Sequence, residues 1–311
     1  MPEPVIIMGR DARVKIALIA VTTAWAVALV AKLQLDFPPA DLVRPLGLAA
    51  VLVAVAVFYK FRGAPQFVSC LMALVFLVAF CAAFVVLMYA IAATNRPLAD
   101  ASLARADQAL GFHVQSFMAW TRSHRWLDTA LRFAYTTILP QTIVVIAVLG
   151  FSGDARALEK FVLRFMVCAL VTVALFYFYP ARGPFAFYGF APAQDQARTL
   201  QQLDAMRSGL RKLVTWRDAE GLITFPSFHA IWAMLLALAF RGRRRLFAAG
   251  VVLNAAVIVS TLSTGWHYLA DVLAGVAVCA AVLAGLCPLE KRLYAGPSQP
   301  SPKVPLRDLL S

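Results

Sequence analysis

The chain has 311 residues, of which 61% are hydrophobic and 14% are charged, and its mean hydropathy is +0.75. Several apolar runs approach the roughly 20 residues that a helix needs to cross a bilayer, which excludes a water-soluble globular protein. The net charge of +13 does not indicate a nucleic-acid partner. Its basic residues are scattered over short loops between the apolar runs.

Eight membrane spans are predicted from hydropathy windows of about 19 residues. Backbone groups in lipid must bond within their own segment, so each span is predicted to be a helix and the fold class an all-α integral membrane protein. The charged stretch 1–13 has no small-residue cleavage site, so we expect the first span to stay as an anchor. The spans lie near residues 14–33, 45–61, 66–93, 129–151, 160–179, 226–240, 246–263 and 267–287.

Basic residues predict the orientation of these spans. With both termini in the cytoplasm, more than half of the 29 Lys and Arg residues but fewer than half of the 16 acidic residues fall on cytoplasmic segments and adjoining span ends. The Arg-Gly-Arg-Arg-Arg turn at 241–245 is the strongest element, and the positive-inside rule favours this arrangement. Loops 94–128 and 180–225 then face outward. The compact length favours a bacterial inner membrane with a periplasmic active site.

The first polar motif follows the fifth span, at Tyr179-Pro180-Ala181-Arg182-Gly183-Pro184. An arginine between two prolines stands on a stiffened backbone, and its planar fork can bind two phosphate oxygens together. An interfacial arginine that meets lipid headgroups is the alternative interpretation. The motifs that follow favour the phosphate ligand.

Segment 195–217 is predicted to be a helix on the outer face. Its apolar residues recur every three or four positions, at Leu200, Leu203, Met206, Leu210, Leu213 and Val214. Such a helix can cover the substrate entrance, or it can be a surface helix that shields the bundle.

The second motif is Phe225-Pro226-Ser227-Phe228-His229, at the start of the sixth span. Proline is tolerated in the first turn of a helix. Ser227 and the unpaired amides of the helix start offer hydrogen bonds and a positive dipole end to an anion. The motif therefore predicts a phosphate site beside His229.

The third motif runs from Thr264 to Asp271 and contains Gly265, Trp266 and His267. His267 and Asp271 are four residues apart, so on a helix they share one face with Cβ atoms about 5–6 Å apart. The carboxylate is expected to accept the Nδ1 hydrogen of His267, which leaves Nε2 as a free nucleophile.

Two other kinds of site remain open. Two histidines and a carboxylate can ligate a transition metal, but Ser227 and Arg182 suit an anion better, so no metal and no cofactor are expected. The five cysteines lie in or at the ends of spans without metal-ligand spacing and are interpreted as packing residues. A lipid transporter is the alternative from another class, yet the sequence contains no inverted repeat or paired broken helices.

The order of the motifs, Arg-x-Pro, Pro-Ser-x-His and Gly-x-His-x-x-x-Asp, resembles the type 2 phosphatidic acid phosphatase superfamily. The resemblance implies a six-helix catalytic core at 66–287, preceded by two extra helices within 1–65 and followed by a cytoplasmic tail at 288–311. The two later motifs are similar to the branch of inositol phosphorylceramide synthases and their bacterial relatives. The stretch from Arg105 to Phe112 is similar too, with Asp107 expected to pair with an arginine.

Carried over by position, the resemblance implies catalytic roles for three residues. His267 would attack phosphorus to give a phosphohistidine, Asp271 would orient it, and His229 would move the proton. The resemblance also implies substrate-binding roles for Arg182, Ser227 and Gly265. The expected partners are a phospholipid donor and a lipid or polyol alcohol acceptor.

Two departures from the superfamily pattern affect the expected reaction. Leu175 and the pair Ser260-Thr261 stand where a lysine and a Ser-Arg pair are expected. Two of the usual three cationic phosphate ligands are therefore missing, unless Arg211, Lys212 or Arg217 replaces them. Positioned positive charge is a main source of phosphoryl-transfer catalysis, so the sequence favours transfer from a lipid phosphodiester. The alternative is a lipid phosphate phosphatase.

Overall fold

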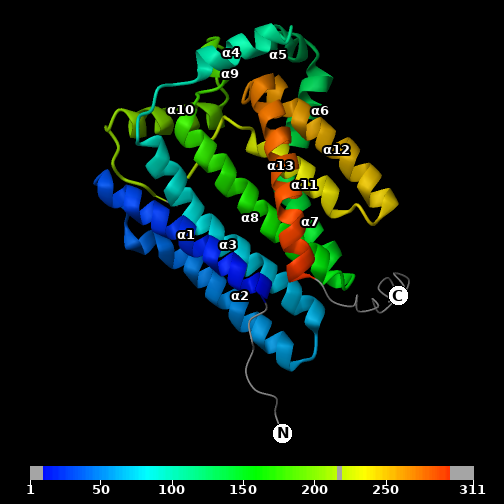
Figure 1. The fold of residues 1–311 in the computed structure, drawn as a ribbon. Helices are drawn as coiled ribbons and strands as arrows, with labels where there is room; N and C mark the ends of the chain where they lie inside the picture. The colour runs from blue at the N-terminus through cyan, green and yellow to red at the C-terminus, as the bar shows by residue number, and fades with distance from the viewer. Residues whose placement is uncertain (1–9, 216–218, 295–311) are drawn as a thin grey trace.

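The structure is a computed structural model that describes residues 10–215 and 219–294. Helices form almost all of its regular structure, and the described part of the chain contains one isolated bridge, between Asp36 and Leu213. Six helices are long and apolar enough to cross a membrane. The all-α integral membrane fold expected from the sequence is confirmed (Figure 1).

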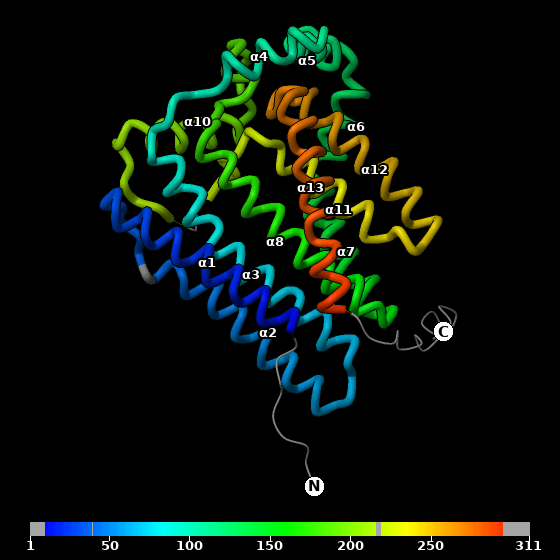
Figure 2. Tube along the Cα trace, in the orientation of Figure 1, coloured from blue at the N-terminus to red at the C-terminus, as the bar shows by residue number. Residues whose placement is uncertain are grey.

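The long helices form one bundle. They are α1 (Arg10–Lys32), α2 (Val43–Phe61), α3 (Pro65–Ala92), α8 (Ala155–Phe178), α12 (Arg244–Ser263) and α13 (Leu269–Leu293). A short helix, η1 (Pro39–Leu42), leads into α2, which packs against α3. Helix α1 packs against α3 and α8. The two N-terminal helices therefore cover one side of the bundle (Figures 1 and 2).

Two of the expected spans are irregular. The fourth is a pair of helices, α6 (Arg125–Thr136) and α7 (Ile138–Phe151), bent by 47° at the break between them. The sixth is α11 (Phe228–Ala239), with 12 residues. At 1.5 Å per residue it is about 18 Å long, which is shorter than the roughly 30 Å hydrocarbon layer. Helix α11 packs against α7, α8, α12 and α13 inside the bundle.

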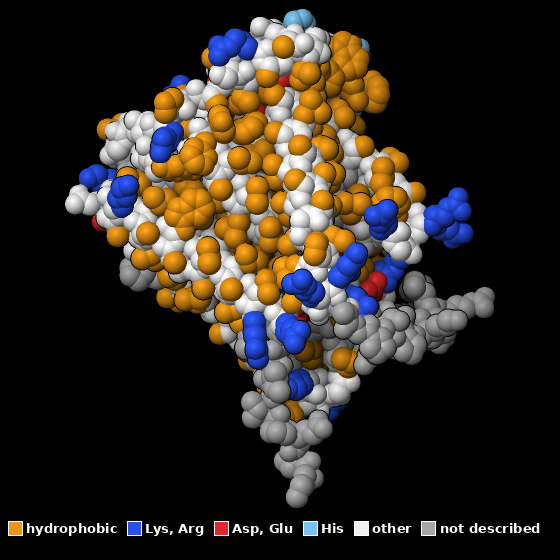
Figure 3. Space-filling model, viewed as in Figure 1, with side chains coloured by type: hydrophobic (Ala, Val, Ile, Leu, Met, Phe, Trp, Pro, Cys, Tyr) orange, Lys and Arg blue, Asp and Glu red, His pale blue; other side chains and the backbone are white. Residues whose placement is uncertain are grey.

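Four shorter helices cover one end of the bundle. They are α4 (Asp100–Ala109), α5 (Val114–Ser123), α9 (Pro184–Phe187) and α10 (Gln194–Arg207). The start of α13 lies at the same end, and the described chain begins and ends at the other (Figures 1 and 2). Hydrophobic side chains cover most of the face seen in Figure 3, and many of the Lys and Arg side chains gather toward the end with the termini. We refer to the covered end as the capped end.

Helix α10 is shorter than the sequence predicts. It ends at Arg207 instead of continuing to residue 217. Gly209 has a φ of +72°, in the left-handed region that stops a helix, and Leu210 beyond it is 89% exposed. Leu203 and Met206 are buried as the apolar pattern predicts. Arg217 and the tail at 296–311 lie outside the described residues.

Ion pairs connect helices at the end with the termini. The Arg164 guanidinium of α8 donates two hydrogen bonds of 2.7 Å to Glu290 of α13. Lys15 of α1 is fully buried and pairs with Asp11 and Glu159. Charges buried in a bundle are stable only when they are paired, so these contacts fix how α1, α8 and α13 meet.

Gly275 allows α13 to approach the start of α11. A Cβ atom at this position would lie 2.6 Å from the Ser227 carbonyl oxygen, closer than any ordinary contact. We expect Gly275→Ala to separate the two helices and to destabilise the protein by about 1–3 kcal/mol, as overpacking of a core does. Thermal unfolding in detergent measures the effect. The matched control is Gly285→Ala on the same helix, where an added Cβ meets nothing within 4 Å. Equal melting temperatures for the two variants would contradict the prediction.

Candidate active site

His267 lies in the turn between α12 and α13, before the first residue of α13. Its side chain is buried, and its Nδ1 atom is 2.8 Å from the Thr224 carbonyl oxygen. A carbonyl can only accept, so this contact fixes the hydrogen on Nδ1 and leaves the lone pair on Nε2. The structure thus gives the nucleophilic tautomer expected from the sequence, with a different acceptor.

Asp271 is not the hydrogen-bond acceptor of His267 that the sequence predicts. The Asp271 Oδ2 atom is 3.5 Å from Nδ1 of His267 and accepts a 2.9 Å hydrogen bond from the Tyr268 backbone amide. The prediction assumed that His267 belongs to the helix, but α13 begins at Leu269. Asp271 is completely buried beside the imidazole, where its negative charge can stabilise a positive ring.

His229 comes from the first turn of α11 and faces His267. The two imidazole centroids are 5.7 Å apart, with an interplanar angle of 58°. The other neighbour of His229 is the Tyr135 ring of α6, which stacks on it at 4.7 Å and 26°. The structure therefore brings the two histidines together as the sequence predicts. Tyr135 was not foreseen, because nothing in its sequence surroundings marks it.

Ser227 is the N-cap residue of α11 and is completely buried. Its hydroxyl accepts a 3.2 Å hydrogen bond from the Ala230 amide, and its own amide donates to the Asp271 carbonyl oxygen at 3.0 Å. The side chain thus caps the helix and joins α11 to α13. The expected phosphate contact of Ser227 stays a prediction.

A cavity of about 450 Å³ opens beside the two histidines. Its inner walls are apolar and come from α3, α8 and α11, including Phe84, Met88, Phe165 and Trp232. Its polar lining consists mainly of Tyr135, Asp195, Thr199, Glu220, His229 and His267. We call this space the histidine cavity. A lining that combines polar and apolar side chains suits an amphiphilic molecule.

Arg182 does not line the histidine cavity. Its Nε and Nη2 atoms donate to Asp204 of α10 at 2.9 and 2.7 Å, and its side chain lines a separate cavity of about 630 Å³ with Arg207. Its backbone is close to the histidines, because the Ala181 carbonyl accepts a 2.9 Å hydrogen bond from the hydroxyl of Thr224, whose own carbonyl is the partner of His267. The expected phosphate contact of Arg182 stays a prediction. The Arg182 guanidinium lies outside the histidine cavity because it forms an ion pair with the Asp204 carboxylate.

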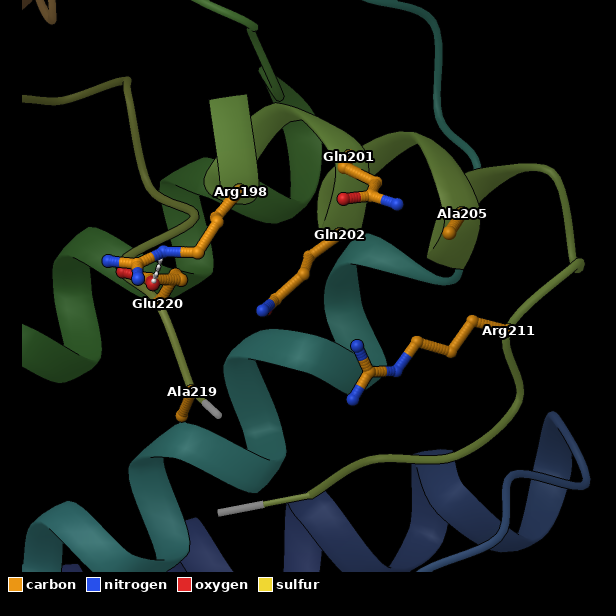
Figure 4. Close-up of a pocket in the computed structure, with 7 residues that line it drawn as sticks. All are labelled: Arg198, Gln201, Gln202, Ala205, Arg211, Ala219 and Glu220. Carbon is orange, nitrogen blue, oxygen red and sulfur yellow. Dashed lines mark ion pairs between the residues drawn. The ribbon is translucent and has the colours of Figure 1, made fainter. Parts of the chain in front are cut away.

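The other candidate cations are also outside the histidine cavity. Arg211 lines a third cavity of about 510 Å³ with Arg198 and Gln201 (Figure 4). Glu220 borders both this cavity and the histidine cavity. The Arg211 guanidinium donates to the Leu213 carbonyl at 2.9 Å. Lys212 is exposed, and Arg217 is not among the described residues. Within the described ranges no group of three or more His, Cys, Asp or Glu side chains is placed to hold a metal.

The comparisons with known proteins identify the family. A model of the PAP2 superfamily, the type 2 phosphatidic acid phosphatases, matches residues 101–285. The chain belongs to the PAP2 superfamily. The comparisons with curated proteins and with solved structures found no match. The PAP2 match contains all three motifs, and membership supports a phosphatase-type or phosphotransferase-type activity.

The PAP2 cations that this chain lacks are replaced by groups with no charge. Leu175 lies on α8, and Ser260 and Thr261 lie on α12. The two hydroxyls donate to carbonyls of their own helix, at 2.5 and 2.7 Å. These three positions therefore supply no positive charge to the site.

Asp100 of α4 connects two PAP2 motifs and was missed by sequence reasoning. Its buried carboxylate accepts hydrogen bonds from the amides of Arg182 and Gly183, at 3.0 and 2.9 Å. It also accepts a 3.0 Å hydrogen bond from the Tyr268 hydroxyl, next to His267. Gly183 has a φ of +95°, and a Cβ there would lie 2.9 Å from the Trp266 carbonyl. The first and third motifs are thus held in direct contact.

Asp107 caps α13 from another helix. It accepts hydrogen bonds from the amides of Leu269 and Ala270, at 3.0 and 2.8 Å. The sequence prediction of an arginine partner for Asp107 is wrong, because the orphan amides of a helix start take its place. Burial raises the pKa of Asp107, and the two amides oppose that rise.

Gly265 has a backbone role in this structure. Its φ of +82° forms the turn that ends α12, and its carbonyl accepts a 3.1 Å hydrogen bond from the Phe185 amide. A Cβ on Gly265 would lie 2.3 Å from the Met118 Cε atom. The predicted substrate contact of Gly265 remains untested, while its place in the turn before His267 explains the need for glycine.

Proposed function

We propose that the protein is a membrane phosphotransferase that moves the phospho-headgroup of a lipid phosphodiester to an alcohol. The observation that carries this proposal is His267, with its Nδ1 hydrogen held by the Thr224 carbonyl at 2.8 Å, facing His229 across 5.7 Å at one end of an amphiphilic cavity. A covalent phosphoryl transfer needs a nucleophilic nitrogen with a free lone pair and a second group that carries the proton. The two histidines can supply these groups.

In the first step, Nε2 of His267 attacks phosphorus and a P–N bond forms. The bond from phosphorus to the leaving alcohol breaks, and His229 gives its proton to that alcohol oxygen. The positive charge on the phosphorylated ring is balanced by Asp271, 3.5 Å from Nδ1. Proton transfer of this kind contributes about 10²–10⁴ in rate.

In the second step, the acceptor alcohol attacks phosphorus and the P–N bond breaks. His229 takes the hydroxyl proton of the acceptor and returns to its starting state. An alcohol acceptor completes a transfer and water completes a hydrolysis, so the acceptor decides between the two activities. We place this reaction at the capped end of the bundle, on the periplasmic face of a bacterial inner membrane, with both termini in the cytoplasm.

The charges around the histidines support a diester donor. Among the described residues, the lining of the histidine cavity contains no Lys or Arg, and Arg182 is neutralised by Asp204. A phosphomonoester dianion needs more compensating positive charge than a diester with a single charge. The site is therefore better matched to a diester.

Labelled substrates test this proposal. The purified protein is given a phosphodiester lipid with a labelled headgroup and a lipid alcohol, and in parallel phosphatidate alone. We expect label in a new lipid product, detected by mass, at a rate well above phosphate release from phosphatidate. Comparable release of free phosphate from phosphatidate would favour the lipid phosphate phosphatase instead. The His267→Gln protein serves as the blank for both reactions.

A further inference from the structure

Two described residues besides the histidines bring a charge to the lining of the histidine cavity, and both are acidic. They are Asp195 and Glu220. Glu220 is paired with Arg198 at 3.0 Å, on the side of the third cavity (Figure 4). Asp195 makes no hydrogen bond or ion pair with any of the described residues. Its carboxylate is therefore a charge of the histidine cavity that has no partner within the described ranges.

The position of Asp195 is fixed by its neighbour in the first turn of α10. Gln196 is 2% exposed, and its Nε2 atom donates a 2.9 Å hydrogen bond to the Thr264 carbonyl, three residues before His267. Its Oε1 atom accepts from the Ala193 amide at 3.0 Å. Asp195 and Thr199 lie one turn apart on the same helix face, and both line the cavity. This face of α10 thus forms the polar wall beside the histidines.

Aromatic rings make up much of the remaining lining. Tyr135, Trp232 and Trp266 all border the cavity, and Tyr135 is held against His229 by stacking at 4.7 Å. The face of an aromatic ring carries negative potential and attracts cations. Aromatic rings together with a carboxylate form a surrounding that suits an ammonium group.

The phosphate of a substrate at His267 would be close to Asp195, and the part of the lining that the structure describes has no Lys or Arg to separate the two negative charges. We propose that the cavity selects a phosphodiester whose headgroup ends in an ammonium group, with Asp195 as the counter-ion of that group. This inference rests on the proposed function. A polyol headgroup can donate hydrogen bonds to Asp195, but it carries no charge to offset the repulsion between carboxylate and phosphate.

Two donors with identical acyl chains test the inference. Phosphatidylcholine ends in an ammonium group and phosphatidylglycerol ends in an uncharged diol, and each phosphate has one negative charge. Release of diacylglycerol by the full-length protein in mixed micelles gives kcat/KM for each. We expect a preference of about tenfold or more for phosphatidylcholine. Asp195→Asn is expected to remove most of this preference. It should lower kcat/KM for phosphatidylcholine and leave kcat/KM for phosphatidylglycerol unchanged.

Asp36→Asn is the matched control, because it removes the same charge from an exposed loop at the capped end that does not line the cavity. It should keep the preference of the unaltered protein. Equal use of the two donors, a preference for phosphatidylglycerol, or equal slowing of both by Asp195→Asn would overturn the inference and leave the phosphotransferase intact. Phosphate release from phosphatidate with no turnover of either diester would overturn both.

Discussion

Replacing His267 with glutamine is expected to lower turnover by about 10⁴-fold or more, as removal of a covalent nucleophile does in other enzymes. Glutamine keeps a side chain that can donate to the Thr224 carbonyl, so the turn before α13 is preserved. No phosphorylated protein should form in this variant. Rapid quenching with a donor labelled in its phosphate, followed by detection of acid-labile label on the protein, measures the intermediate directly.

His229→Gln separates the proposed proton transfer by His229 from the proposed attack by His267. It should slow turnover by about 10²–10⁴-fold, and phosphorylation of His267 should still be detectable with a donor whose leaving group needs no proton. His113→Gln, on the capped end and outside the histidine cavity, should leave turnover unchanged. Substantial turnover by His267→Gln, or phosphorylation of that variant at the same site, would sink the covalent mechanism.

Asp100→Ala is expected to destabilise the protein by about 3 kcal/mol or more, because three donors, two of them buried, lose their acceptor. These donors are the amides of Arg182 and Gly183 and the hydroxyl of Tyr268. Their loss frees the first motif from the third, so turnover should fall as well. The melting temperature in detergent should drop by roughly 5 °C or more.

Tyr268→Phe is the graded comparison for Asp100→Ala. It removes one of the donors and keeps the aromatic ring that is buried in the capped end, so its melting temperature should lie between those of the unaltered protein and Asp100→Ala. An Asp100→Ala protein that melts like the unaltered one would show that Asp100 does not join the motifs in solution.

The helix bundle was predictable because a chain in lipid can satisfy its backbone hydrogen bonds in few ways. Apolar runs must be helical in a membrane, and each of the eight predicted spans coincides with a helix or a bent pair. The end of α10 was missed because the apolar repeat continues to Val214, whereas Gly209 adopts a left-handed conformation that ends the helix. The left-handed backbone conformation at Gly209 thus ends the helix although the apolar side-chain repeat continues beyond it.

The proximity of His229, His267 and Asp271 was predictable from the sequence, whereas their hydrogen-bond contacts were not. The spacing of His267 and Asp271 suggested a direct hydrogen bond on one helix face, but the histidine precedes α13, so that geometry does not apply. Asp100 and Asp107 bind backbone amides more than 80 residues away along the chain. Backbone amides have no signature in a sequence, so such partners cannot be found from residue types.

The group that accepts the Nδ1 hydrogen of His267 is the main-chain carbonyl of Thr224. No side-chain substitution at residue 224 deletes a peptide oxygen, and a peptide oxygen does not titrate in the range where enzymes work. The Thr224 carbonyl therefore accepts the Nδ1 hydrogen of His267 whether or not the nearby carboxylates are protonated. Mutational scanning alone would overlook the group that orients His267, and replacing that amide by an ester would be needed to probe it.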